Sequence, residues 1–283
     1  MATGSFNLGL GEIWDALFQT DHAARTVVWE LRLPRALLAA LAGAVLSIGG
    51  FYMQALVRNP LADPYIMGLT AGAGLGVNLG ILGIIPIAAG IWSYPILAGL
   101  GALVSLMLLL GLGFRSLGDD SNRLLIAGVA VSAILTAITG FLIYRFAEDD
   151  QVRRVVFWTF GSLHRATWPA VQVGLGVFGL ALGFGILQGR KMDVLILGDT
   201  TAQSLGLAPG PFKLTLLAVA SLTVGGIVAF TGPIGFVGMM IPHVCRAMFG
   251  LHHRPNMILG ACLGAAFLLS ANALSQPQIH PEI

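Results

Sequence analysis

Long stretches of this chain contain no charged or histidine side chain. No aspartate, glutamate, lysine, arginine or histidine occurs at 64–114, 124–144, 168–189 or 214–242. Soluble domains carry about 25% charged residues, whereas this chain has 10%, together with 56% hydrophobic residues and a mean hydropathy of +0.85. The sequence therefore predicts a polytopic membrane protein in which lipid, not water, faces most side chains.

Eight stretches are candidates to cross a bilayer. A spanning helix needs about 20 mostly apolar residues, and the candidates are 33–57, 64–85, 91–114, 124–146, 168–188, 212–230, 234–249 and 256–275. The seventh is short, follows Pro233 and contains Pro242, so a broken or re-entrant helix is an alternative there. The 38 glycines are typical of membrane helices that pack closely. We expect one all-α membrane helix bundle over residues 1–283.

Two polar segments interrupt the apolar pattern. Residues 147–167 are amphipathic and too polar to span, which predicts an extracytoplasmic segment at the membrane surface. In that segment Val152, Val155, Val156 and Phe160 lie on the face opposite Arg153 and Arg154. Residues 190–213 form the second segment, and the short loops on its side of the membrane favour a cytoplasmic position.

The segment 190–213 has the pattern of a compact knob. Asp199 can cap a short helix by accepting backbone N–H groups, and Gly206 can end that helix in a left-handed conformation. DVLILG, which ends at Gly198, reads as another short element before it. Such a knob can fit the groove of a soluble partner, while an ordinary connecting loop is the alternative.

The chain has no nucleotide-binding motif of its own. A phosphate-binding loop needs Gly-Lys-[Ser/Thr], and the only lysines, Lys191 and Lys213, follow Arg190 and Phe212. ATP-driven transport would therefore need an ATPase on another chain. The spans also lack the carboxylates and histidines that ion-coupled carriers usually need. An ion-coupled secondary transporter or channel stays as the alternative, because broken helices can bind sodium through carbonyl groups.

Other chemistry-bearing residues have simpler explanations. Ser162 and His164 lie in the interfacial segment without an orienting carboxylate, which speaks against a hydrolase. Adjacent histidines do not converge on one helix face, so His252 and His253 indicate a loop instead of a metal site. A hydrogen bond at a helix break explains His243. Cys245, Cys262 and the methionines at 53, 67, 107, 239 and 240 are expected to serve packing. We predict no catalytic residue and no metal site.

Four stretches in this order resemble the FecCD-type permeases, the membrane subunits of bacterial ABC importers for iron-siderophores, haem and cobalamin. They are LRLPRALLAALAGAVLSIGGFYMQALVRNPLADPYIMGLTAGAGLG from Leu31, RLLIAGVAVSAILTAITG from Arg123, LILGDTTAQSLGL from Leu195 and TGPIGFVGMMIPHVCR from Thr231. The resemblance covers about Gly9 to Leu274. It implies a homodimer of permeases in the bacterial inner membrane, two ATPase subunits inside and a binding protein outside, with no nucleic acid.

The resemblance also implies roles for particular residues. The knob would dock in a groove of the ATPase through Asp199, Thr200, Ala202, Gln203, Gly206 and Leu207. The cytoplasmic gate would contain Asn59, Leu61, Ser121 and Asn122. Arg32 and Arg35 would meet acidic residues of the binding protein, with anchoring at a helix end as the alternative. We expect small, weakly polar residues such as Ser132, Thr136 and Thr139 to line the pathway.

The chain departs from the family pattern at both ends. Members have ten helices, whereas this sequence starts after the first and stops at residues 276–283, where the tenth would begin. We therefore expect eight spans with both ends outside, and a homodimer of this chain alone depends on the missing helix. By analogy the chain is not an enzyme and binds no cofactor, with ATP and Mg²⁺ on the partner ATPase. The frequency of substrates in the family favours a siderophore, then haem, then cobalamin.

Overall fold

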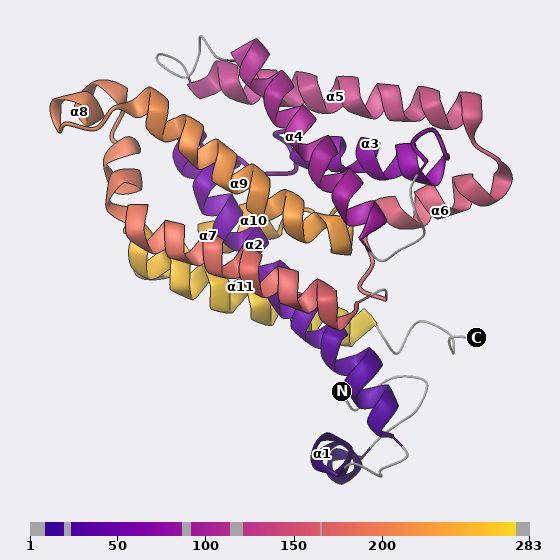
Figure 1. The fold of residues 1–283 in the computed structure, drawn as a ribbon. Coiled ribbons are helices and arrows are strands. Elements are labelled where there is room, and N and C mark those ends of the chain that lie inside the picture. The colour runs from indigo at the N-terminus through magenta and orange to yellow at the C-terminus, as the bar shows by residue number, and fades with distance from the viewer. Residues whose placement is uncertain (1–8, 20–23, 87–91, 114–120, 165, 276–283) are drawn as a thin grey trace.

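The computed structural model describes residues 9–19, 24–86, 92–113, 121–164 and 166–275, and these ranges contain helices and no strand (Figure 1). The all-α prediction is confirmed. The helices are α1 (Leu10–Phe18), α2 (Leu33–Val57), α3 (Leu69–Ile81), α4 (Ser93–Gly113), α5 (Ser121–Phe146), α6 (Asp149–Thr159), α7 (Trp168–Leu195), α8 (Asp199–Ser204), α9 (Pro209–Thr231), α10 (Val237–Phe249) and α11 (His253–Ser275). A π-helical turn, Val27–Arg32, leads into α2.

Six of the described helices are long and apolar enough to cross a membrane. The predicted spans 64–85 and 234–249 instead contain α3 and α10, which have 13 residues each. At 1.5 Å per residue such a helix is about 20 Å long, shorter than the roughly 30 Å hydrocarbon core. Both begin after a residue with positive φ, Gly68 at 85° and Phe236 at 68°. The count of eight full spans is thus not confirmed.

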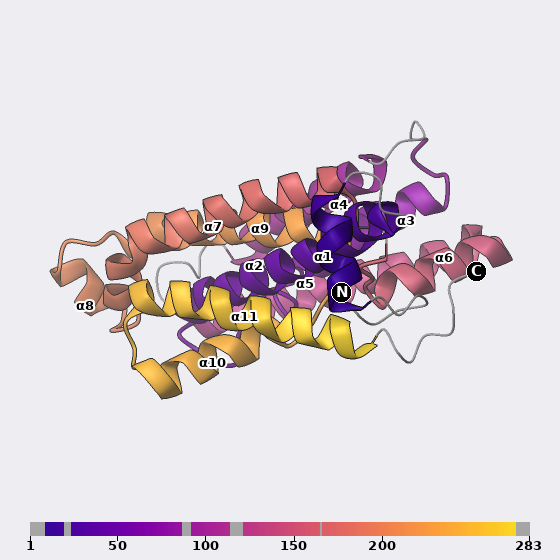
Figure 2. The ribbon, with the colours of Figure 1, turned by 90° about the horizontal axis from the view of Figure 1, so that it is seen from below.

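Helix α2 forms the centre of the bundle and packs against α7, α9, α10 and α11 (Figures 1 and 2). Two glycines on α2 allow this close approach. A Cβ atom on Gly43 would lie 2.0 Å from the carbonyl oxygen of Gly264 on α11, and one on Gly50 would lie 1.8 Å from that of Gly238 on α10. Small residues at these crossings bring backbones together where lipid supplies no hydrophobic force between helices.

A second group of helices packs beside this centre. Helix α3 lies against α4, where a Cβ on Gly72 would be 2.3 Å from the carbonyl oxygen of Gly101. Helix α4 also packs against α9, and this contact joins the second group of helices to the group around α2. Helix α5 is the least buried of the six long apolar helices, with 17% of its apolar window covered by the chain. Its outer face therefore has to meet lipid or a second protein.

Helices α6 and α8 lie at opposite ends of the bundle (Figure 1). Glu148 and Gln151 form a capping box at the start of α6, and Arg154 pairs with Asp150 at 2.6 Å. Among the four apolar residues predicted to share a face, the chain itself buries only Val155. The two polar segments of the sequence therefore lie at opposite ends of the bundle, and their assignment to the two sides of the membrane stays a prediction.

Candidate functional site

The knob consists of one short helix, α8, between two glycines with positive φ. Gly198 has φ 108° and Gly206 has φ 82°. Beyond the helix, the N–H groups of Gly206 and Leu207 donate to the carbonyl oxygens of Gln203 and Ala202, both at 2.9 Å. The predicted short element DVLILG is wrong, because Asp193–Leu195 are the last residues of α7.

The outer surface of the knob faces away from the chain. Thr200, Gln203 and Gly206 are exposed, whereas Ala202 is buried and Leu207 packs against the core. An open hollow of about 460 Å³ follows the helix and is lined by Gln203 and residues 206–211. The predicted coupling residues are therefore gathered on one small exposed feature at one end of the bundle, with Ala202 holding it to the interior.

Asp199 does not cap α8, so that prediction is wrong. Gly198 occupies the cap position, and no side chain accepts a hydrogen bond there. The Asp199 carboxylate instead accepts from the Lys213 ammonium at 2.6 Å and lies 3.9 Å from a guanidinium nitrogen of Arg58. The Lys213 side chain is 1% exposed. A buried ammonium needs a counterion. The free energy of leaving Lys213 unpaired is larger than the stabilisation that a helix cap would provide, so the carboxylate pairs with Lys213.

The predicted gate residues are described only in part. Asn59 accepts the N–H of Leu61 at 2.9 Å through its side-chain oxygen, which makes a tight turn directly after Arg58. Leu61 is exposed. Ser121 begins α5, but its side chain and that of Asn122 lie outside the described residues. Arg58, which directly precedes the turn Asn59–Leu61, lies near Asp199 of the knob, so the turn and the knob are close in space. That this turn forms a gate together with Ser121 and Asn122 stays a prediction.

The predicted pathway residues share a cavity. Ser132, Thr136 and Thr139 of α5 line a space of about 160 Å³ together with Tyr65, Thr70, Ala71, Gly74, Asn78, Trp158, Thr159 and Pro233. Asn78 was not predicted; its side-chain oxygen is buried and has no hydrogen-bond partner among the residues that the structure describes. The sequence did contain a signal for Asn78, because its amide side chain stands within a largely apolar stretch. The cavity wall is weakly polar, and its role as the transport pathway stays a prediction.

Sequence reasoning also missed Asp63. This residue lies in an irregular segment between α2 and α3 and is buried. Its carboxylate accepts the N–H of Tyr65 at 2.7 Å and a backbone N–H of Met239 near the start of α10. Burial raises the pKa of the Asp63 carboxyl above its usual value, and the two backbone donors oppose that rise. Asp63 thereby ties the irregular segment that precedes α3 to the first turn of α10.

Arg35 is engaged within the chain. Its Nε donates to the side-chain oxygen of Asn272 on α11 at 3.0 Å, and one Nη lies 3.3 Å from Nδ1 of His164. This contact gives His164 a structural role. Arg32 ends the π-helical turn before α2 and is partly buried. Docking of a binding protein at Arg32 and Arg35 stays a prediction.

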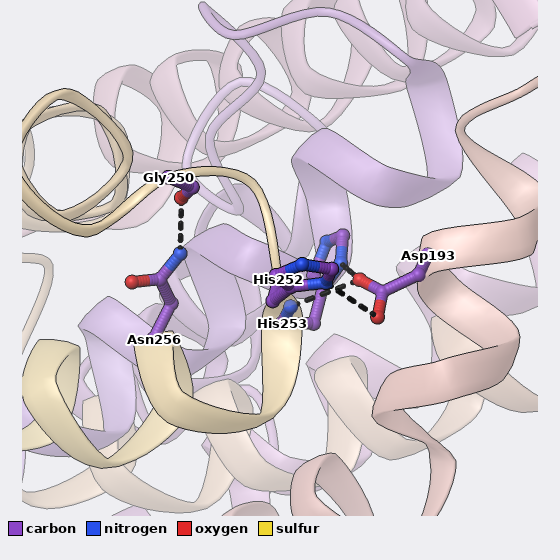
Figure 3. Close-up of polar contacts among 5 residues, drawn as sticks. All are labelled: Asp193, Gly250, His252, His253 and Asn256. Atoms are coloured by element: carbon purple, nitrogen blue, oxygen red, sulfur yellow. Dashed lines mark hydrogen bonds and ion pairs between the residues drawn. The ribbon is translucent and has the colours of Figure 1, made fainter.

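His252 and His253 converge on one carboxylate, contrary to the expectation from their adjacency (Figure 3). Asp193, on the last turn of α7, accepts from the His253 backbone N–H at 2.9 Å and lies 2.6 Å from His253 Nδ1. Its other oxygen is 3.8 Å from Nδ1 of His252. Only His253 is buried, because it opens α11 while His252 precedes that helix. The cluster joins the last turn of α7 to the first residue of α11.

Comparison with known proteins decides the family. The model of the FecCD transport family matches residues 1–282. The hemin transport system permease protein HmuU of Yersinia pestis is 35% identical over 281 residues, which cover 98% of this chain and 83% of that protein. The chain belongs to the FecCD transport family.

Two further relatives support the assignment. The iron(3+)-hydroxamate import system permease protein FhuB of Bacillus subtilis is 34% identical over 280 residues, covering 96% of this chain and 70% of that protein. A metal-chelate type ABC transporter in an inward-facing conformation superposes with a TM-score of 0.85 and 27% identity, covering 94% of this chain and 83% of that one. The FecCD resemblance is confirmed, and the chain is a multi-pass ABC permease.

For this FecCD permease, Asp193→Ala is expected to destabilise the junction of α7 and α11 by about 1–3 kcal/mol, the usual cost of leaving buried polar groups unpaired. The variant removes the acceptor for two groups of His253. Thermal unfolding of the purified permease in detergent measures the change. Asp193→Asn retains an oxygen for the His253 N–H and should lose less. An unchanged midpoint in Asp193→Ala would show that the cluster adds nothing to stability.

Proposed function

We propose that this chain is the permease subunit of an ABC importer that carries an iron chelate across the bacterial inner membrane. The main support is the structural match over 94% of the chain to a metal-chelate type ABC transporter. A siderophore is the first candidate, followed by haem and cobalamin. The sequence identities to a hemin permease and to a hydroxamate permease are nearly equal, at 35% and 34%, so they do not distinguish the substrates. The order of the candidates therefore rests on how frequent each substrate is in the family.

Energy enters from a partner ATPase that binds ATP and Mg²⁺ and docks on α8. The exposed Thr200, Gln203 and Gly206 and the adjacent hollow suit a groove on a second protein. Closure of two ATPase subunits would rock the helices between two packings, with the chelate passing near Ser132, Thr136 and Thr139. The exposed apolar face of α5 is the surface we assign to a second permease copy.

Reconstitution of the permease with its ATPase and binding protein in liposomes tests the proposal. We expect uptake of a ferric hydroxamate that requires ATP and stops with a non-hydrolysable analogue. Hemin and cobalamin tested in parallel rank the three substrates. Uptake that follows a sodium or proton gradient without nucleotide would instead establish the ion-coupled carrier. Native mass spectrometry of the complex checks for two permeases and two ATPase subunits.

A further inference from the structure

Three charged side chains meet where α2, α8 and α9 come together at the inner end of the bundle. Lys213 lies in α9, Asp199 is the first residue of α8, and Arg58 follows the last residue of α2. We call these three residues the charge link. Lys213 is 1% exposed and bonded to Asp199 at 2.6 Å. Separating such a buried pair would leave an uncompensated charge inside the protein, which is strongly unfavourable. The pair therefore holds α8 against α9.

Arg58 connects this pair to α2. One Asp199 oxygen is buried, accepts no hydrogen bond from any described residue and lies 3.9 Å from a guanidinium nitrogen of Arg58. The same nitrogen lies 3.4 Å from the position of a Cβ on Gly198. A charge-assisted hydrogen bond is about 2.8 Å long, so a movement of about 1 Å would close the gap.

The backbone of Arg58 adds an independent observation. Arg58 has φ 54°, and Phe236 is the only other non-glycine residue with positive φ in the part of the chain that the structure describes. This region is unfavourable for side chains other than glycine, asparagine and aspartate, and such outliers gather at functional positions. The conformation ends α2 and places Asn59 and Leu61 directly beyond it.

We propose that the charge link transmits displacement of α8 to the turn Asn59–Leu61 at the inner end of α2. Along the chain α8 is joined to α7 and α9 alone, so the side chains of Asp199 and Arg58 provide a direct route from the knob to α2. Arg58, Asp199 and Lys213 are positioning residues: they act through the knob and the turn, and none contacts substrate. The inference rests on the proposed function, in which α8 meets the ATPase and the turn belongs to the gate.

The main test compares Arg58→Gln with wild type in the complete reconstituted complex. We expect chelate uptake per ATP hydrolysed to fall at least tenfold, while ATPase binding and hydrolysis stay within twofold of wild type. Arg58→Lys keeps the charge and should lose less. Arg58 is partly exposed, at 27% of its side chain, so the variant avoids the folding risk of changing Lys213. Unchanged uptake per ATP in Arg58→Gln would overturn the proposal.

The buried pair is tested by charge exchange. Lys213→Met should uncouple uptake as Arg58→Gln does, and Lys191→Met on exposed α7 surface is the matched control that should not. Asp199→Lys combined with Lys213→Asp restores an ion pair between α8 and α9 but places a cation beside Arg58, so thermal stability should recover relative to either single variant while uptake stays low. Spin labels at Leu205 and Pro60, both exposed, report movement of the knob and of the turn without replacing a proposed docking or gate residue. We expect one narrow distance in all nucleotide states of wild type and a broadened distribution in Arg58→Gln.

Failure of the link and failure of the function give different results. A wild-type permease that binds no ATPase and shows no ATP-dependent uptake would refute the proposed function, and the link with it. Wild-type transport with an unaffected Arg58→Gln variant and unchanged label distances would refute the link alone. If the variants lose uptake only in proportion to the amount of folded permease they retain, as judged by thermal unfolding, the three residues have a structural role only.

Discussion

Gly206→Trp is expected to reduce ATP-dependent uptake at least tenfold and to weaken binding of the ATPase, while membrane insertion persists. No heavy atom of the described chain lies within 4 Å of a Cβ built on Gly206. The indole would therefore project outward and separate the knob from a partner groove without disturbing the bundle. The left-handed φ of 82° adds roughly 1–2 kcal/mol of local strain. Co-purification of the ATPase and uptake in liposomes measure the effect.

Two controls separate the bulk of the side chain from backbone strain. Gly206→Ala carries the same strain without the bulk and should retain most uptake. Gly83→Trp has similar properties, with φ 69° and open space around its Cβ, but it follows α3 in the second group of helices. It should leave ATPase binding intact. Wild-type ATPase binding and uptake in Gly206→Trp would remove the coupling role from α8.

Gly50→Ala is expected to lower the free energy of unfolding by about 1–3 kcal/mol or more, the usual cost of overpacking. The added methyl would lie 1.8 Å from the carbonyl oxygen of Gly238. That oxygen belongs to the backbone of α10 and cannot rotate away as a side chain could, so α2 and α10 would have to separate. Thermal unfolding in detergent, monitored through tryptophan fluorescence, measures the loss of stability.

Gly179→Ala is the matched control for this crossing. Gly179 lies within α7, and among the described residues no atom outside its own stretch of that helix comes within 4 Å of the position of its Cβ. Alanine has a better helix propensity than glycine by roughly 1 kcal/mol, so this variant should be neutral or slightly stabilising. If Gly50→Ala unfolds at the wild-type temperature, the close α2–α10 crossing is not what holds these helices together.

The positions of the long helices and of the knob were predictable because their signals are local. Hydropathy is a property of consecutive residues, and it located α2, α4, α5, α9 and α11 to within three residues at each end. It found the start of α7 but ended that helix at 188, whereas α7 continues to Leu195. Gly206 ended α8 for an equally local reason, its freedom to adopt a left-handed conformation. The motifs around Arg58, Asp199 and Pro242 were sufficient to predict the FecCD family.

Only the tertiary structure decided which distant residues meet. A cap was the natural local role for Asp199, yet Lys213 is buried beside it and claims the carboxylate. Asp63 lies between two predicted spans by sequence, but it is buried and its carboxylate accepts backbone N–H groups of Tyr65 and of Met239 on α10. His252 and His253 diverge on an ideal helix, but one of them precedes α11 and both reach Asp193 (Figure 3). The energy of a buried charge depends on what surrounds it in space, which hydropathy along the chain does not record.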